Sequence, residues 1–391
     1  MTEKTSTSQK AALKFVILLG IVSLCADATY EGARSITGSY LGVLGASATV
    51  VGLVAGLGEL IGYGLRLITG YISDQTRQYW KMTTLGYFIN TAVVPLLALA
   101  GTWPIAACLM IAERTGKAIR TPARDVLLSH AAIKVGTGFG FGIHEALDQI
   151  GATIGPLAVA AMLYFQQGYQ GGFAILVVPA LLGLIVLLVL QRFYPSPRDF
   201  ETVTLEMKGE GLPRVFWIYL AAVALVGAGY TDFPLIAYHF HKNSISDSAI
   251  PLLYALAMGI DAIAALIFGR LFDRRGISIL IIAVFLSVLF APLVFLGNQQ
   301  MAWLGMALWG IGMGAQESIM KAAIAGMVPA DKRGSAFGIF YTGYGLSWFL
   351  GSALMGILYD RSVGTLVVFS VAIQLAAIPI LMLVKRQTHP I

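Results

Sequence analysis

The sequence predicts an all-α membrane protein of twelve transmembrane helices, arranged as two pseudo-symmetric six-helix bundles with both termini in the cytoplasm. Three observations predict this fold class: an apolar composition, apolar runs along the whole chain, and a one-sided distribution of basic residues. The 391 residues are 57% hydrophobic and 12% charged, about half the charged fraction of an ordinary soluble domain. Lipid must therefore be the main solvent, and we expect a multi-pass protein of the cell (inner) membrane.

Each apolar run is close to or above the roughly 20 residues that a helix needs to cross a bilayer. The runs predict spans at 13–42, 48–69, 82–101, 104–124, 136–165, 172–193, 214–240, 249–269, 277–297, 300–325, 334–358 and 364–384. Residues 1–12 are polar and lack a cleavage-site pattern, so we expect the first span to be retained. Cys25 and Cys108 both lie inside apolar runs, so we expect no disulfide framework.

Basic residues assign the orientation of the spans. Of the 26 Lys and Arg residues, five lie deep inside predicted spans, Lys242 and Arg361 lie on one side of the membrane, and the other 19 lie on the side of the termini. Positively charged loops stay in the cytoplasm, so both termini are expected there. This placement accounts for the formal charge of +6 without a nucleic-acid partner.

Short motifs recur in the same order at a spacing near half of the chain length. They are Gly-x-x-x-Asp at 70–74 and 269–273, Glu-x-x-x-Lys at 113–117 and 317–321, and Phe-Gly-Ile at 141–143 and 337–339. Such matches indicate a duplicated unit of six spans. We expect an N-terminal bundle of 1–193, a cytoplasmic linker of 194–213 and a C-terminal bundle of 214–391.

These motifs resemble signatures of the major facilitator superfamily over essentially the full chain. The first signature, Gly-x-x-x-Asp-Arg-x-Gly-Arg, is similar to Gly70-x-x-x-Asp74-Gln-Thr-Arg77 and to Gly269-x-x-x-Asp273-Arg274-Arg-Gly276. The antiporter signature is similar to Gly142-x8-Gly151-x3-Gly155-Pro156, although Val159-Ala160 replaces its closing Gly-Gly. The resemblance implies two bundles that rock about a central cavity, as in proton-coupled drug or metabolite antiporters.

The same motifs predict a conformational gate. Glycine permits close helix approach, and an aspartate near an arginine at a helix end can form an ion pair that biases one conformation. Glycine and proline in span 5 permit close packing and bending. The expected gate residues are Gly70, Asp74, Arg77, Gly269, Asp273, Arg274, Gly151, Gly155 and Pro156. The alternatives are solvated loop charges and generic small-residue packing.

Ionisable residues inside the predicted spans are the most informative feature, because a charge within the bilayer usually faces a cavity or a partner. Asp27, Glu31 and Arg34 share one face of span 1, at i, i+4 and i+7. The expected proton-coupling residues are Asp27, Glu31, Glu113, Arg114, His144, Glu145 and Asp148. The expected substrate-binding residues are Tyr30, Arg34, Lys117, Asp232, Glu317 and Lys321. The alternative is a set of static salt bridges between helices.

The resemblance adds to this assignment, since spans 1, 4, 7 and 10 line the cavity of the facilitator fold. Arg114, in Met110-x-x-x-Arg114-Thr-Gly116-Lys117, falls near the arginine of the family's span 4 signature, Leu-x-x-x-Arg-x-x-Gln-Gly. The family associates that arginine with proton coupling. The Gln-Gly portion is missing from this chain.

Motifs for other energy sources and for enzymes are missing from the sequence. We find no nucleotide-binding loop, no His-Glu-x-x-His and no Gly-x-Ser-x-Gly, so we expect no cofactor, no metal and no enzyme activity. We therefore expect an ion or solute gradient to drive transport, with protons as the expected ion and sodium as the alternative. Our first hypothesis is a monomeric exporter of a small polar or charged organic solute. The others are a proton symporter that imports an organic anion, and an intramembrane enzyme or lipid-handling protein.

Overall fold

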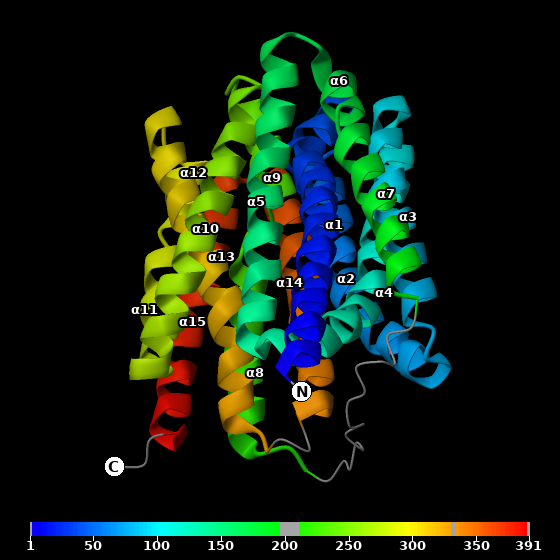
Figure 1. Cartoon of the computed structure of the whole chain (residues 1–391). Helices are drawn as coiled ribbons and strands as arrows, with labels where there is room; N and C mark the ends of the chain where they lie inside the picture. The colour runs from blue at the N-terminus through cyan, green and yellow to red at the C-terminus, as the bar shows by residue number, and fades with distance from the viewer. Residues whose placement is uncertain (1, 196–210, 330–332, 389–391) are drawn as a thin grey trace. The chain divides into compact units, whose positions relative to one another are not determined.

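The computed structural model describes residues 2–195, 211–329 and 333–388, and every regular element within those ranges is helical. The first six spans are α1 (Thr2–Val43), α2 (Ala48–Thr76), α3 (Tyr79–Leu96) with the 3-10 turn η1 (Leu97–Leu99), α4 (Trp103–Val135), α5 (Thr137–Tyr164), and α6 (Gly168–Ala174) with α7 (Val177–Phe193) (Figure 1). The other six are α8 (Arg214–Gly229) with α9 (Phe233–Lys242), α10 (Ala249–Arg275), α11 (Ser278–Ser287) with α12 (Phe290–Phe295), α13 (Gln299–Met327), α14 (Arg333–Arg361) and α15 (Val363–Thr388). These elements confirm the twelve predicted spans.

Nine helical segments of the described chain are long and apolar enough to cross a membrane by length and composition. The helices α4, α13 and α14 complete the set of twelve spans. Helix α4 is less apolar than its neighbours because it carries several charged side chains, of which Glu113 and Arg120 are buried. The span with the lowest apolar character thus carries both an acid and a base into the protein interior.

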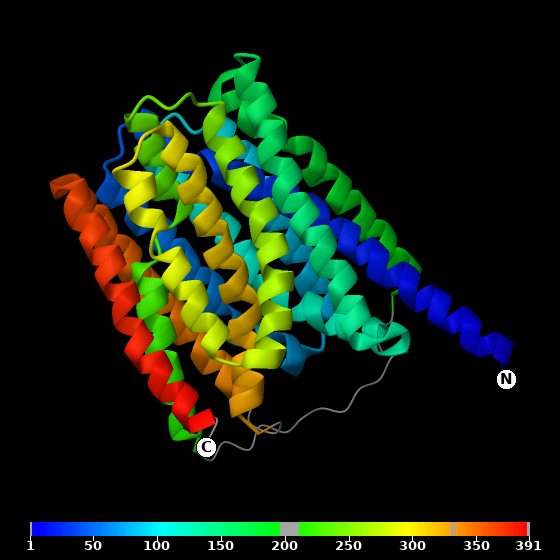
Figure 2. The same ribbon diagram turned by 90° about the vertical axis from the view of Figure 1, so that its left-hand side faces the viewer.

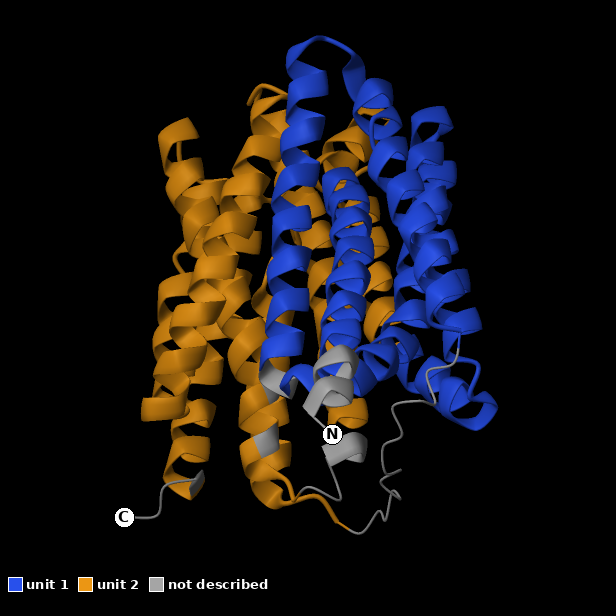
Figure 3. Cartoon of the chain, viewed as in Figure 1, with its two compact units in different colours: residues 1–34, 65–204 blue, residues 35–64, 205–391 orange. Residues whose placement is uncertain are grey.

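The chain forms two compact units (Figure 3). Unit 1 contains residues 1–34 and 65–204, and unit 2 contains residues 35–64 and 205–391. The segment 35–64, which holds the end of α1 and the beginning of α2, thus groups with the C-terminal spans, whereas the sequence assigned it to the N-terminal bundle. Most of the predicted linker, 194–213, lies outside the described residues.

The interior of unit 1 combines an apolar cluster with the polar site described below. Helix α3 packs along α4, and α5 packs against both α4 and α6. Phe15, Leu19, Leu127 and Leu187 belong to a buried hydrophobic cluster that joins α1, α4 and α7. Because lipid tails are as apolar as these side chains, van der Waals packing between them is what holds this end of the unit together.

In unit 2, α10 packs along α13, and α8 packs against α14 and α15 (Figure 2). The seventh span is interrupted between α8 and α9, which leaves backbone carbonyls without a helical donor. Gly229 O accepts hydrogen bonds from Ser370 Oγ at 2.6 Å and Gln374 Nε2 at 3.0 Å, and Thr231 O accepts from Trp309 Nε1 at 3.0 Å. These side chains satisfy the carbonyls, which is the condition for a broken helix at membrane depth.

Candidate functional site

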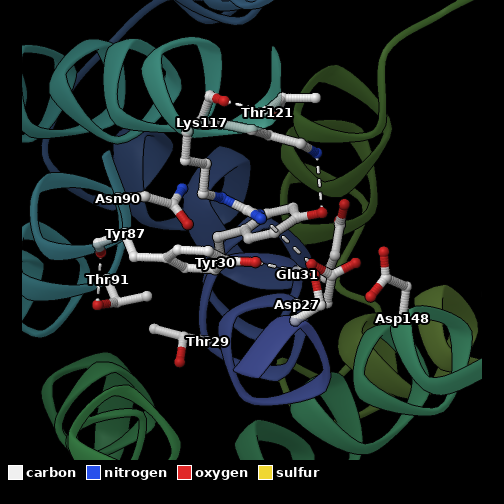
Figure 4. Close-up of polar contacts among 12 residues, drawn as sticks. Asp27, Thr29, Tyr30, Glu31, Tyr87, Asn90, Thr91, Lys117, Thr121 and Asp148 are labelled. Atoms are coloured by element: carbon white, nitrogen blue, oxygen red, sulfur yellow. Dashed lines mark hydrogen bonds and ion pairs between the residues drawn. The ribbon is translucent and has the colours of Figure 1, made fainter. Parts of the chain in front are cut away.

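Polar side chains of α1 and α4 meet in pairs inside unit 1 (Figure 4). Lys117 Nζ donates a hydrogen bond to Tyr30 Oη at 2.8 Å, and the same ammonium lies 4.0 Å from the centre of the Tyr30 ring. One turn further along α4, Arg120 Nη2 lies 3.6 Å from Asp27 Oδ1. The steps of three residues on both helices match one helical turn, so each pair occupies its own level along the two helices.

A third level continues the series. Arg124 Nη1 donates to Ser23 Oγ at 3.0 Å, while Nε and Nη2 of Arg124 donate to Asp125 Oδ1 at 2.9 and 2.7 Å. The paired residues run in opposite order along α1 and α4. We call the three contacts the α1–α4 ladder, which consists of Tyr30 with Lys117, Asp27 with Arg120, and Ser23 with Arg124.

Arg120 is the most deeply buried charged residue of this ladder, with 1% of its side chain exposed. Its guanidinium lies 4.4 Å from the centre of the Tyr87 ring, and Tyr87 Oη hydrogen-bonds with Ser23 Oγ at 3.0 Å. In the described part of the chain, Nε and Nη1 of Arg120 have no hydrogen-bond partner. The charge of Arg120 is therefore balanced mainly by Asp27 and by the π-face of Tyr87.

Helix α5 adds two predicted residues to the ladder. Asp148 Oδ2 lies 3.7 Å from Arg124 Nη1 and 3.4 Å from His144 Nδ1. The Asp148 carboxylate points toward α1 and interacts electrostatically with Asp27 (Figure 4). Glu145, by contrast, is exposed and lies 3.5 Å from Gln149 Nε2 on its own helix. The structure thus brings His144 and Asp148 to the ladder and places Glu145 on the outer side of α5.

The remaining predicted charges of unit 1 lie on α4 and α1, on the far side of the contact between Lys117 and Tyr30 from Asp27 and Arg120. Asn90 Nδ2 donates to Glu113 Oε1 at 2.6 Å, and Arg114 Nε lies 3.4 Å from Glu113 Oε2. On α1, Arg34 Nη1 lies 3.9 Å from Glu31 Oε1. Glu31 and Glu113 are both less than 9% exposed. Both acids are buried beside bases, and Glu113 also accepts a hydrogen bond from the Asn90 amide of α3.

The predicted substrate-binding residues divide between the units. Tyr30, Arg34 and Lys117 lie in unit 1, while Asp232 and Glu317 lie in unit 2. Asp232 is 2% exposed and occupies the position before the first turn of α9, at the interruption of the seventh span. Glu317 is exposed on α13, and the side chain of Lys321 lies outside the described residues.

The predicted glycines of span 5 mark a close crossing of α5 over α1. A Cβ on Gly151 would overlap the Leu24 carbonyl oxygen, and a Cβ on Gly155 would overlap that of Ala28. Pro156, the next residue, is buried in the same helix. In unit 2, Gly351 of α14 meets the Ala228 carbonyl of α8 in the same way. Equivalent helices of the two halves therefore cross at equivalent glycines, which supports the internal repeat.

The glycines of the two Gly-x-x-x-Asp motifs do not mark the close helix approach that the sequence predicted. A Cβ on Gly70 would lie 3.6 Å from Pro122 Cβ, and one on Gly269 would lie 3.7 Å from Ser318 Cβ. Both distances are ordinary van der Waals contacts, so neither position requires glycine. Asp74 is exposed and accepts a hydrogen bond from Tyr79 Oη at 3.5 Å.

The ion pairs expected at the ends of these motifs are not formed in this conformation. Arg77 and, in unit 2, Asp273 and Arg274 are exposed. Across the residues that the structure describes, neither Asp74 with Arg77 nor Asp273 with Arg274 forms an ion pair.

Several residues of the site were not predicted from the sequence. Tyr87 and Asn90 come from α3, which carries no charged residue after Lys81 and was therefore read as a plain span. Arg120 lies near the end of the predicted span 104–124 and was not among the expected site residues. A signal was present in each case, since Tyr87 and Asn90 are three residues apart and Arg120 is three residues beyond Lys117.

Comparison with known proteins places the chain in a family. The model of the Major Facilitator Superfamily matches residues 19–352 and, in a second match, 230–390. A protein of Mycobacterium tuberculosis described as uncharacterized is 42% identical over 383 residues, which cover 96% of this chain and 94% of the relative. An uncharacterized MFS-type transporter of Methanocaldococcus jannaschii is 30% identical over 371 residues, 92% of each chain.

Solved structures show the same fold at low sequence identity. The crystal structure of the nucleoside transporter NupG matches with a TM-score of 0.73 and 14% identity, over 95% of this chain and 98% of that one. The peptide transporter POT in complex with sulfate matches with a TM-score of 0.73 and 14% identity, over 95% and 94%. With its twelve helical spans and this family match, the chain is a multi-pass membrane transporter and not an enzyme, and it belongs to the Major Facilitator Superfamily.

Proposed function

We propose that this protein is a proton-coupled exporter of a small polar or charged organic solute, working by alternating access. The observation that carries the proposal is the buried contact of Asp27 with Arg120, next to Asp148. A buried carboxylate favours its neutral form, whereas a neighbouring cation favours its charged form. A conformational change that lengthens the contact between Asp27 and Arg120 would therefore load or release a proton.

The remaining site residues fall into two groups under this proposal. Asp27, Glu31, Glu113, Arg114, His144 and Asp148 take part in proton coupling, with Asp27 and Glu31 as the main carriers, whereas the exposed Glu145 does not. Tyr30, Arg34, Lys117, Asp232, Glu317 and Lys321 contact the solute. The partly buried bases Arg34 and Lys117 favour a solute with an anionic group, because a desolvated cation gains most from a charged partner.

The proposal includes a membrane orientation and a gate. The excess of Lys and Arg on one side favours cytoplasmic termini, with 1–193 and 214–391 as the moving bundles of a monomer. Asp74 and Arg77, and Asp273 and Arg274, form their ion pairs in a different conformation of the cycle. Gly142, Gly151, Gly155 and Pro156 support the antiporter assignment through their similarity to the family's signature.

A transport assay in vesicles tests the coupling ion. A thermal-shift screen of metabolites and drugs on the purified protein supplies a solute, which is then offered to everted vesicles with an imposed pH gradient. The proposal is supported if solute uptake depends on the imposed proton gradient, and if Glu31→Gln abolishes this uptake without loss of expression. Asp247→Asn, at a carboxylate that pairs locally with His241, is the matched control and keeps wild-type coupling. Uptake that follows a sodium gradient, or normal coupling in Glu31→Gln, contradicts it.

Import of an organic anion with protons is the second candidate. It is favoured by three bases inside predicted spans of unit 1, Arg34, Arg114 and Lys117. The two candidates differ in direction, so right-side-out vesicles accumulate the solute under an inward proton gradient only in the import case. Everted vesicles accumulate it under the opposite arrangement only in the export case.

A further inference from the structure

The first turn of α2 receives its capping group from a distant helix of unit 2. Asp360, near the end of α14, accepts hydrogen bonds from the backbone N–H groups of Ala48 and Thr49, at 3.1 and 2.8 Å, and from Thr49 Oγ1 at 2.6 Å. The first backbone N–H groups of any helix lack partners within the helix, and a carboxylate is their preferred acceptor. We call these three contacts the Asp360 cap.

Close packing of the same two helices continues beyond the Asp360 cap. A Cβ on Gly52 would overlap the Ser352 carbonyl oxygen, and a Cβ on Gly56 would lie 3.0 Å from the Phe349 carbonyl oxygen. On the other side, a Cβ on Gly356 would lie 2.6 Å from the Ala48 carbonyl oxygen. Helices α2 and α14 are therefore in backbone contact along several turns, and the Asp360 cap closes the end of this contact.

The two helices come from different halves of the repeated sequence. Helix α2 belongs to the first six spans and α14 to the second six, yet residues 35–64 pack with the C-terminal spans as one compact unit. A facilitator alternates between states by moving its repeats against each other. The packing of α2 on α14 therefore belongs to one state of the cycle and must loosen in the other.

We propose that the Asp360 cap stabilises the state in which α2 is packed on α14, and that this cap is released when the transporter changes conformation. The cap suits a reversible contact because Asp360 is exposed, so both the carboxylate and the freed N–H groups can be hydrated when the helices part. The contact of Asp27 with Arg120 lacks this exposure, because both side chains are buried. A contact of this kind needs to bias the equilibrium only modestly to set the populations of the two states.

Spin-label distances test this without any solute. Labels are placed at Leu53 on α2 and Leu354 on α14, each 40% exposed, in a chain in which Cys25 and Cys108 are replaced by serine. Double electron–electron resonance in lipid nanodiscs then reports the fraction of molecules in which the two helices are packed. We expect one dominant short distance in the chain that keeps Asp360.

Asp360→Ala should raise the ratio of long to short distances about fivefold, since charge-assisted hydrogen bonds are removed from the packed state alone. Thr49→Val removes one of the three donors and should give a smaller shift in the same direction. Asp247→Ala is the control, because this carboxylate bonds with His241 in its own segment and should leave the distribution unchanged.

An unchanged distribution in both Asp360→Ala and Thr49→Val would overturn the proposal. If Asp360→Ala fails to fold, Thr49→Val, which keeps the carboxylate, decides the question. Neither outcome bears on proton coupling at Asp27, since the labels report helix packing in unit 2, whereas the vesicle assay reports the coupling ion.

Discussion

Asp27 and Arg120 form a buried ion pair between α1 and α4, with 3.6 Å between Oδ1 and Nη2 and with 10% and 1% of the two side chains exposed. The arginine is enclosed by the Tyr87 ring and by the close approach of α3, where a Cβ on Gly86 would overlap the Arg120 backbone. An enclosed cation of this kind depends on its carboxylate, and the carboxylate depends on it in turn. Substitution of either residue therefore tests the role of the other.

Arg120→Met should destabilise the protein strongly. The methionine keeps much of the volume but leaves the Asp27 carboxylate buried without its cation, a change that costs about 3–5 kcal/mol in comparable sites. The melting temperature in detergent measures this loss. The double variant Arg120→Met/Asp27→Asn should recover much of it, because the buried charge is gone. Simple addition of the two single effects would show that the pair is not coupled.

Asp148→Asn should impair proton coupling far more than Glu145→Gln. Asp148 contacts Arg124 and His144, whereas Glu145 is exposed on the outer side of α5. The pH profile of solute transport in proteoliposomes should flatten in Asp148→Asn, with at least a tenfold loss of the pH-driven rate. Glu145→Gln should stay within about twofold of the parent protein. Equal losses of the pH-driven rate in the two variants would show that Glu145 takes part in proton coupling despite its exposure.

Gly155→Ala should destabilise the protein, whereas Gly70→Ala should be tolerated. The added methyl group would overlap the Ala28 carbonyl oxygen in the first case and make an ordinary 3.6 Å contact with Pro122 in the second. Overpacking of this kind costs about 1–3 kcal/mol, which thermal unfolding resolves. Gly351→Ala should behave like Gly155→Ala, because it meets the Ala228 carbonyl oxygen in the second half. Equal melting temperatures for all three variants would contradict the crossing.

Asp74→Ala should slow turnover more than it weakens solute binding, because the proposed gate acts on conformation and not on the binding residues. Tyr79→Phe provides the comparison, since it removes the hydrogen bond that Asp74 accepts from Tyr79. We expect turnover to stay near the parent value in Tyr79→Phe, because the proposed ion pair of Asp74 with Arg77 would form in another conformation. Transport rates and solute affinity, measured on the same preparations, separate the two effects. Unchanged turnover in Asp74→Ala would refute the gate.

The Gly-x-x-x-Asp elements show where sequence reasoning was too specific. The motif suggested that Gly70 and Gly269 permit close helix approach, but both positions have room for a methyl group. The glycines that do permit backbone contact include Gly52 and Gly356, which belong to no signature. A glycine in a membrane helix shows that close approach is possible, and only the neighbouring helix shows whether it occurs.

The sequence alone determined the twelve helical spans and the internal repeat. A lipid solvent requires long apolar helices, so span positions follow from local composition, and duplicated motifs such as those that precede Gly155 and Gly351 persist in the chain itself. The sequence also indicated acids that are buried, such as Asp27, Glu31 and Glu113, because a charge inside an apolar run needs a cavity or a partner. It did not distinguish them from Glu145 and Glu317, which lie inside predicted spans and are exposed.

Only the tertiary structure decided which partners those residues take. Asp27 meets Arg120, Lys117 meets Tyr30, and Asp360 caps a helix more than 300 positions away in the sequence. The same tertiary contacts assign residues 35–64 to unit 2. Helical periodicity determines which face a side chain occupies, but the partner on that face depends on how helices far apart in the chain pack together.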